Sequence, residues 1–186
     1  LARMLPKRKW YRRPVDIVLG KAIFYFILYL LMAIYAYAAV TRWFSLPDVG
    51  DYFVFLRFII PYLLACIFLA MVLSVLVYRR EDCIMLFVFL SVPLLFMSGI
   101  SWPGSEIPEF WKYVSWLFPS TFGMNGYLRI MGTGASIEDI HHEYVGLWCQ
   151  VGVYGILACI MYRLRLKAIV KRLSSAKNRQ KMYQEE

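Results

Sequence analysis

Four apolar runs of membrane-spanning length constrain the fold of this chain more than any other feature. They cover about residues 22–40, 53–77, 84–100 and 144–162. Because an α-helix rises about 1.5 Å per residue, roughly 17–25 apolar residues cross the hydrocarbon core of a bilayer. Hydrophobic residues make up 61% of the 186 residues, and they are gathered into these runs. We therefore predict an all-α, polytopic membrane protein with four transmembrane helices.

The segment between the third and fourth runs is unlike an ordinary loop. After Pro103, Glu106, Glu109 and Lys112 are interleaved with apolar and aromatic residues. Pro119 then interrupts the segment, and a second short apolar piece ends at Gly132. Irregular backbone at membrane depth is tolerated only where protein or a water-filled cavity satisfies its N–H and C=O groups. Residues 103–132 are thus predicted to form a re-entrant helical hairpin that enters and leaves on the external face and lies along a pathway.

Basic residues set the orientation of these helices. Of the 21 lysines and arginines, 17 lie in residues 1–21, at Arg79 and Arg80, or after Tyr162. Cytoplasmic flanks of membrane helices are enriched in Lys and Arg. Both termini are therefore predicted to lie in the cytoplasm.

This orientation divides the chain into a basic cytoplasmic segment (1–20), a transmembrane domain (21–165) and a basic cytoplasmic tail (166–186), whose end after Ser174 we expect to be frayed or disordered. The net charge of +9 could suggest nucleic acid. However, the basic blocks flank the apolar runs, where lipid head groups lie. We predict membrane lipid, and not nucleic acid, as a partner.

Residues 1–20 allow two interpretations. In the first, they are a juxtamembrane stretch that lies on anionic lipid. In the second, they end in a short amphipathic helix that docks a partner, with Pro14 in its first turn and Val15, Val18 and Leu19 on one face. Sequence alone favours the first interpretation.

The last predicted helix has a recognisable start. Ser136 and Asp139 have the spacing of a capping box. Within the helix, Gly146, Gly152 and Gly155 would supply a small-residue face for close helix contact.

The chain offers no catalytic constellation of its own. It contains no Gly-rich phosphate loop, GxSxG elbow or HExxH motif. Adjacent helical residues point about 100° apart, so His141, His142 and Glu143 are poorly placed to share a metal ion. The four cysteines lack CxxC spacing and are interpreted as buried small hydrophobes: Cys66, Cys83, Cys149 and Cys159. We expect no metal or cofactor on this chain, and an ATP-driven function would place its ATPase on another polypeptide.

Three charged residues are candidates for a role within the membrane. Arg57 lies near the outer end of the second run, where it could line a pathway or anchor the helix at the interface. Glu106 and Glu109 are three residues apart on one helix face, which suits an acid/base pair, a cation site or simply the wet face of an interfacial half-helix.

The order of several short motifs resembles the permease of ABC-2 type (type V) ABC transporters, more particularly the C-terminal portion of one half-transporter. Val18-Leu19-Gly20-Lys21 opens a span after a basic segment. Ser98–Pro103, Ile107–Trp111, Pro119–Thr121 and Ile130–Gly132 then follow at the spacing of the family's span, re-entrant pair and final span. A family half has six spans, and we expect this chain to hold the last four.

The resemblance implies partners and site residues. Two permease halves, identical or different, would pair around a substrate path. Each would touch an ABC ATP-binding subunit that carries ATP and Mg²⁺, and a periplasmic adaptor is left open as a further partner. Coupling to the ATPase would fall on Asp16, Leu19, Gly20 and Lys21, with Arg79 and Arg80 as a second contact. The external gate would fall on Gly99, Pro103, Glu106, Glu109, Trp111 and Pro119.

From these features we predict the transmembrane permease subunit of an ATP-driven exporter in the bacterial cytoplasmic (inner) membrane, without a catalytic site of its own. One alternative is an intramembrane enzyme that uses Glu106, Glu109 and His141 on a lipid substrate. A second alternative is a membrane assembly protein that transports nothing.

Overall fold

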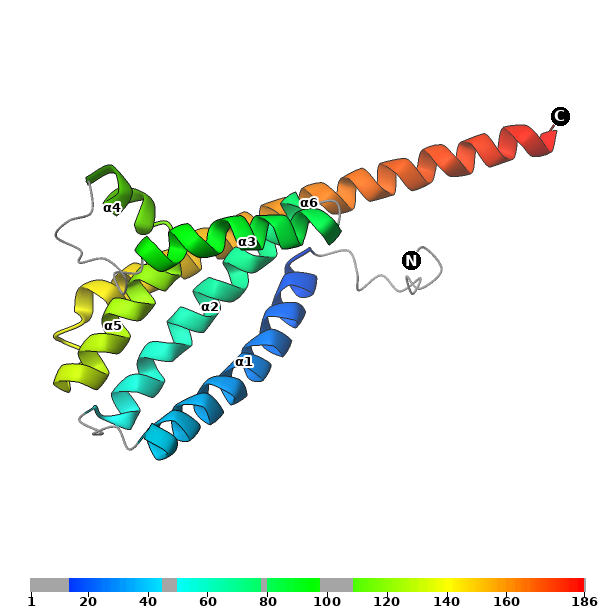
Figure 1. The fold of residues 1–186 in the computed structure, drawn as a ribbon. Coiled ribbons are helices and arrows are strands. Elements are labelled where there is room, and N and C mark those ends of the chain that lie inside the picture. Colours follow the sequence, from blue (N-terminus) through cyan, green and yellow to red (C-terminus); the bar gives the residue numbers. More distant parts are fainter. Residues whose placement is uncertain (1–13, 45–49, 78–79, 98–108, 186) are drawn as a thin grey trace.

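The computed structural model describes residues 14–44, 50–77, 80–97 and 109–185, and in these residues all regular structure is helical (Figure 1). The predicted all-α class is confirmed. The helices are α1 (Pro14–Phe44), α2 (Tyr52–Leu76), α3 (Arg80–Met97), α4 (Glu109–Ser115), α5 (Pro119–Thr133) and α6 (His141–Glu185).

Helix α2 is the central element. It contacts α1, α5 and α6, and its contact with α6 is the most extensive in the fold. It is also the most apolar helix, with a mean hydropathy of 2.6 over its best stretch. A helix that is apolar on every side can be covered on several faces at once, by protein and by lipid.

Two core clusters hold α2 in place, one at each end of the bundle. At the end where α2 begins, Phe55, Phe58 and Ile59 pack against Phe122 and Ile130 of α5 and against the start of α6. We call this the Tyr52 end. At the other end, which we call the Pro14 end, the second cluster joins α1, α2 and α6 through Val18, Ala22, Ile67, Met71 and Ala158.

Small residues set the spacing between α5 and α2. A Cβ atom added at Gly123 would overlap the ring of Tyr62, and one added at Gly126 would overlap the ring of Phe58. Of the predicted small-residue face on α6, Gly146 lies close to Phe122, Gly155 makes ordinary contact with Phe68, and Gly152 faces open space. Small residues are favoured where two membrane helices approach closely, because a larger side chain would overlap the neighbouring helix.

Within the described residues, three helices are long and apolar enough to cross a membrane: Val18–Trp43, Tyr52–Val75 and His141–Arg165. They correspond to the first, second and fourth predicted spans. Helix α3 covers residues 84–97 of the third, and residues 98–100 lie outside the described part. Its first three residues are charged, so the apolar remainder measures about 22 Å, short of a hydrocarbon core of about 30 Å. The third predicted span, over residues 84–100, therefore stays a prediction.

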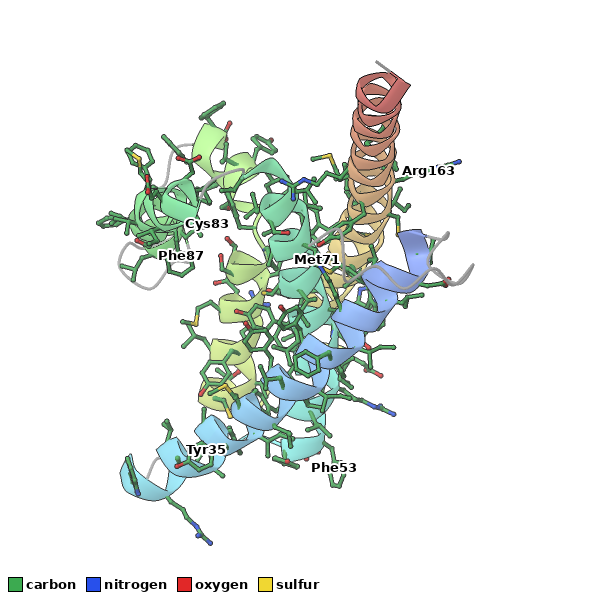
Figure 2. All side chains as sticks on the ribbon, turned by 90° about the vertical axis from the view of Figure 1, so that its right-hand side faces the viewer. Tyr35, Phe53, Met71, Cys83, Phe87 and Arg163 are labelled. Atoms are coloured by element: carbon green, nitrogen blue, oxygen red, sulfur yellow. The ribbon has the colours of Figure 1, made fainter. Side chains whose placement is uncertain are left out.

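Helix α3 differs in direction from α1, α2 and α5. Figure 2 shows it nearly end-on, where Cys83 and Phe87 are labelled, whereas α1, α2 and α5 are seen from the side. It packs chiefly against α4 and α5. Much of its apolar surface, including Ile84, Met85 and Phe89, is exposed.

The end of α6 corrects one expectation. Residues after Ser174 are not irregular: α6 continues to Glu185 and projects well beyond the bundle (Figure 1). No glycine or proline follows Gly155 to interrupt the helix, and Ala, Leu, Lys, Arg and Gln favour helix.

The glycines of α5 provide a test of this packing. Replacing Gly126 by alanine should destabilise the protein by about 1–3 kcal/mol, because the buried Phe58 ring must move. Gly132 is the matched control on the same helix, since nothing lies within 4 Å of a Cβ atom added there. G126A should lower the melting temperature of the purified protein, whereas G132A should leave it unchanged or raise it. Equal midpoints for the two variants would contradict the close packing of α5 on α2.

Candidate functional site

The turn between α4 and α5 is held against the side of α6. Gln150 Nε2 donates a hydrogen bond of 2.7 Å to the carbonyl oxygen of Trp116, and the Tyr154 hydroxyl donates to the carbonyl oxygen of Leu117. Both acceptors follow the last helical residue of α4, where carbonyl groups lack intrahelical partners. Side chains of α6 thus satisfy backbone groups that a short helix leaves free.

This contact lies deep along α6. With α6 beginning at His141, Gln150 and Tyr154 are about 14 Å and 20 Å from its start. The span-length part of α6 ends at Arg165. The turn is therefore near the middle of that part and not at its end.

Helix α5 starts at this depth and runs to the Tyr52 end of the bundle. Phe118 is extended and Pro119 occupies the first helical position, where its fixed φ angle suits a helix start. The helix ends at Gly134, whose φ of 65° is left-handed. There the Gly134 N–H donates to the Ile130 carbonyl, as in the αL C-cap motif, and the Ala135 N–H donates to the Arg129 carbonyl.

Polar groups line the seam between α5 and α6. Arg129 Nη1 lies 3.3 Å from Glu143 Oε1, with Glu143 buried and Arg129 largely exposed. Within the described residues, four buried side-chain atoms have no hydrogen-bond partner: Ser120 Oγ, Thr121 Oγ1, Glu143 Oε2 and Gln150 Oε1. Buried polar atoms of this kind usually form hydrogen bonds with water or with a polar ligand.

A groove of about 210 Å³ runs between α2 and α5 beside this seam. Phe55, Phe58 and Tyr62 form one wall, and Ser120 and Tyr127 stand on the other. Its surface is mainly aromatic with a few hydroxyl groups. Such a surface suits flat or apolar groups that carry a hydrogen-bonding function.

The residues predicted for the external gate fall in different places. Pro119 is buried at the start of α5, next to the turn on α6. Glu109 and Trp111 are exposed on α4, which packs against α3. Gly99, Pro103 and Glu106 lie outside the described residues. The structure therefore brings Pro119, but not Glu109 or Trp111, to the polar seam.

The residues predicted for coupling gather at the start of α1. Asp16, Leu19 and Gly20 are exposed, whereas Val18 and Ala22, on the opposite face, are buried in the core. Lys21 instead reaches α6, with Nζ 3.4 Å from the Tyr162 hydroxyl. Arg79 lies outside the described residues, and Arg80 begins α3.

Arg57 and the histidine pair also have defined positions. Arg57 is exposed in the second turn of α2 and is not among the residues that line the α2–α5 groove, so its pathway role stays a prediction. The His142 ring lies 6.3 Å, between centroids, from the rings of Trp116 and Phe122. Among the described residues, no group of three or more His, Cys, Asp or Glu side chains could hold a metal ion.

The predicted capping residues do meet. The Ser136 N–H and hydroxyl both donate to Asp139 Oδ2 at 2.9 Å. The backbone hydrogen bond from Ser136, followed by the hydroxyl, lowers the pKa of Asp139 below its usual range. The α-helix itself begins at His141, after a turn over residues 137–140.

Sequence reasoning missed the residues that build the seam. The buried positions of α6 recur at spacings of three and four: Glu143, Leu147, Gln150, Tyr154 and Ala158. Two of the five, Glu143 and Gln150, are polar. Polar residues on the buried stripe of an apolar helix are the signal that could have identified them.

A known family matches most of the chain. The family described as ABC-2 family transporter protein matches residues 12–160. This chain belongs to the ABC-2 transporter family. The resemblance drawn from the sequence motifs is confirmed, and the chain is a membrane-embedded permease of the ABC-2 type. Comparison with curated proteins and with solved structures gives no match.

Family membership also bears on the two alternative functions. It favours transport over a purely structural role. Of the residues suggested for an intramembrane enzyme, Glu109 is exposed on α4 and His141 is exposed at the start of α6. No contact between these two side chains is seen in the described part of the chain, and Glu106 lies outside it.

The hydrogen bonds to the turn can be tested by hydrogen exchange. Y154F and Q150L should each remove about 1 kcal/mol, so the amides of Leu117 and Phe118 should exchange about fivefold faster. Tyr35 is exposed on α1, and Y35F therefore serves as the matched loss of a tyrosine hydroxyl. Exchange that is equally slow in Y154F, Q150L and Y35F would show that these bonds do not hold the turn.

Proposed function

We propose that this ABC-2 permease is the transmembrane subunit of an ATP-driven exporter, and that it forms the substrate path and couples to a separate ATP-binding subunit. The turn of residues 116–118, bound to the middle of α6 by Gln150 and Tyr154, carries the proposal. Broken helices at this depth are typical of membrane proteins whose irregular backbone lies along a water-filled route.

In this proposal α4 and α5 are the described part of the re-entrant hairpin predicted over residues 103–132. Two observations support it. Helix α5 is only 15 residues long, about 22 Å, and is too short to cross alone. The unpartnered polar atoms of Ser120, Thr121 and Gln150 would then contact water or cargo.

The proposed location is the bacterial inner membrane with both termini in the cytoplasm. The distribution of Lys and Arg supports this orientation. Figure 1 is consistent with it, because the start of α1 and the projecting part of α6 lie at the same end of the bundle. The Arg165 Nη2 atom donates to the Val77 carbonyl at 3.2 Å, which places the end of α2 there as well.

Helix α3 is proposed as the third span and as a surface for the second permease half. Exposed fractions of 76% at Phe87 and 79% at Phe89 mean that these rings need lipid or protein around them. Contiguous apolar surface of this kind marks membrane or protein contact.

Coupling is proposed at the start of α1, where Asp16, Leu19 and Gly20 are exposed on the face opposite the core contacts of Val18 and Ala22. The ATP-binding subunit, with its ATP and Mg²⁺, would press on this face. Movement of α1 would reach α2 and α6 through the cluster at the Pro14 end.

Substitutions on this face test the coupling. D16K and G20W should reduce the stimulation of ATP hydrolysis by the permease about fivefold or more, because they change charge and shape where the partner docks. Nothing lies within 4 Å of a Cβ atom added at Gly20, so the permease itself should still fold.

The control is Leu31→Ala, which is also at an exposed position, in the middle of α1. All variants are assayed with the ATP-binding subunit co-expressed, and complex formation is measured beside ATPase activity. If D16K and G20W retain full ATPase stimulation and transport, the start of α1 is not the coupling site.

A further inference from the structure

A second groove opens at the Pro14 end, between α1, α2 and α6. Its volume is about 290 Å³. It shares no lining residue with the α2–α5 groove at the other end. The residues that line it are Lys21, Tyr25, Tyr29, Ile67, Ala70, Met71, Ser74 and Tyr162.

One rim of this groove carries a positive charge. Lys21 Nζ lies 3.4 Å from the Tyr162 hydroxyl and 5.2 Å from the centre of its ring. An ammonium group has three N–H donors, and the Tyr162 hydroxyl takes one. No described carboxylate forms an ion pair with Lys21.

The rest of the groove is largely apolar. Ile67 and Met71 are buried beneath it. Ala70 has a small side chain that leaves room above them. Along α1, Lys21, Tyr25 and Tyr29 recur every four residues and so share a face, and the two tyrosine rings stack at 6.3 Å.

The groove has the right depth for a lipid. Lys21 and Tyr162 each lie three residues from the polar end of a span-length helix, Val18–Trp43 or His141–Arg165. From Lys21 the lining extends to Tyr29, about 12 Å further along α1 toward the membrane centre. A cation at head-group level is therefore followed by an apolar channel at the level of the acyl chains.

We propose that this groove binds one anionic phospholipid, with its phosphate on Lys21 and the Tyr162 hydroxyl and one acyl chain along Tyr25, Tyr29 and Ala70. A transmembrane helix about 10–12 Å across is too wide for a groove of this volume. A zwitterionic lipid also has a phosphate, but its cationic head group would bring a second positive charge beside Lys21, whereas an anionic lipid brings none. The site does not depend on the proposed transport function.

Lipid retention tests the site directly. The intact membrane assembly is extracted from vesicles of equal parts phosphatidylglycerol and phosphatidylcholine, and native mass spectrometry counts the lipids that remain on each chain. The unmodified protein should retain phosphatidylglycerol preferentially. K21Q should lower that preference about fivefold. R42Q removes a cation at the other end of the same helix and should leave the preference unchanged.

A second measurement places the acyl chain. A70F should reduce retention of both lipids, since its ring would occupy the channel above Ile67 and Met71. A benzophenone side chain introduced at Tyr29 should crosslink to lipid on irradiation.

Three outcomes would overturn the proposal. In the first, the unmodified protein retains phosphatidylglycerol and phosphatidylcholine equally. In the second, K21Q and R42Q lower the preference for phosphatidylglycerol by the same factor. In the third, the benzophenone at position 29 crosslinks to protein instead of lipid. The second outcome would indicate diffuse attraction of anionic lipid to a basic protein. The third would mean that another protein segment covers the groove.

Discussion

The structure depends on how backbone groups are satisfied where the chain is interrupted within the bundle. Trp116 and Leu117 follow the last residue of α4, where their carbonyl groups have no helical partner, and Gln150 and Tyr154 of α6 donate to them. An unsatisfied carbonyl in a hydrocarbon environment would be destabilised by several kcal/mol. These two side chains therefore allow α5 to start part-way along α6. From that start, α5 packs against α2 and the beginning of α6 at the Tyr52 end of the bundle.

Close packing and polarity combine at the same place. Gly123 and Gly126 let α5 approach the rings of Tyr62 and Phe58, while the other side of α5 meets the polar stripe of α6. A groove lined by aromatic residues and Ser120 lies on one side of this short helix, and the stripe of α6 with the unpartnered atoms of Glu143 and Gln150 lies on the other. That combination suits a route for cargo better than it suits a static core, in which buried polar groups are nearly always paired.

The Pro14 end has a different character. Its core is small and apolar, and α1 is attached to α2 and α6 through a few contacts around Val18, Ala22 and Ala158. Exposed residues at the start of α1 and the charged rim of the second groove lie on the same helix within a few residues of each other. A partner ATPase and an anionic lipid would therefore act on the same helix, α1, and movement of its start would reach α2 and α6 through the same few contacts.

The sequence by itself determined the membrane, the helical class and the position of three span-length helices, because long apolar runs can satisfy their backbone in lipid only as helices. It also determined the family, since the motifs around Gly20, Pro103 and Pro119 occur in a specific order. The tertiary structure alone decided that Gln150 and Tyr154 meet the turn at residues 116–118, that Glu143 pairs with Arg129, and that Lys21 reaches Tyr162. Each of these contacts joins residues 14 or more positions apart, and no local pattern encodes which faces of α1, α5 and α6 come together. The direction of α3 is also a tertiary property, because an apolar helix with little protein around it is oriented by its neighbours and not by its own residues.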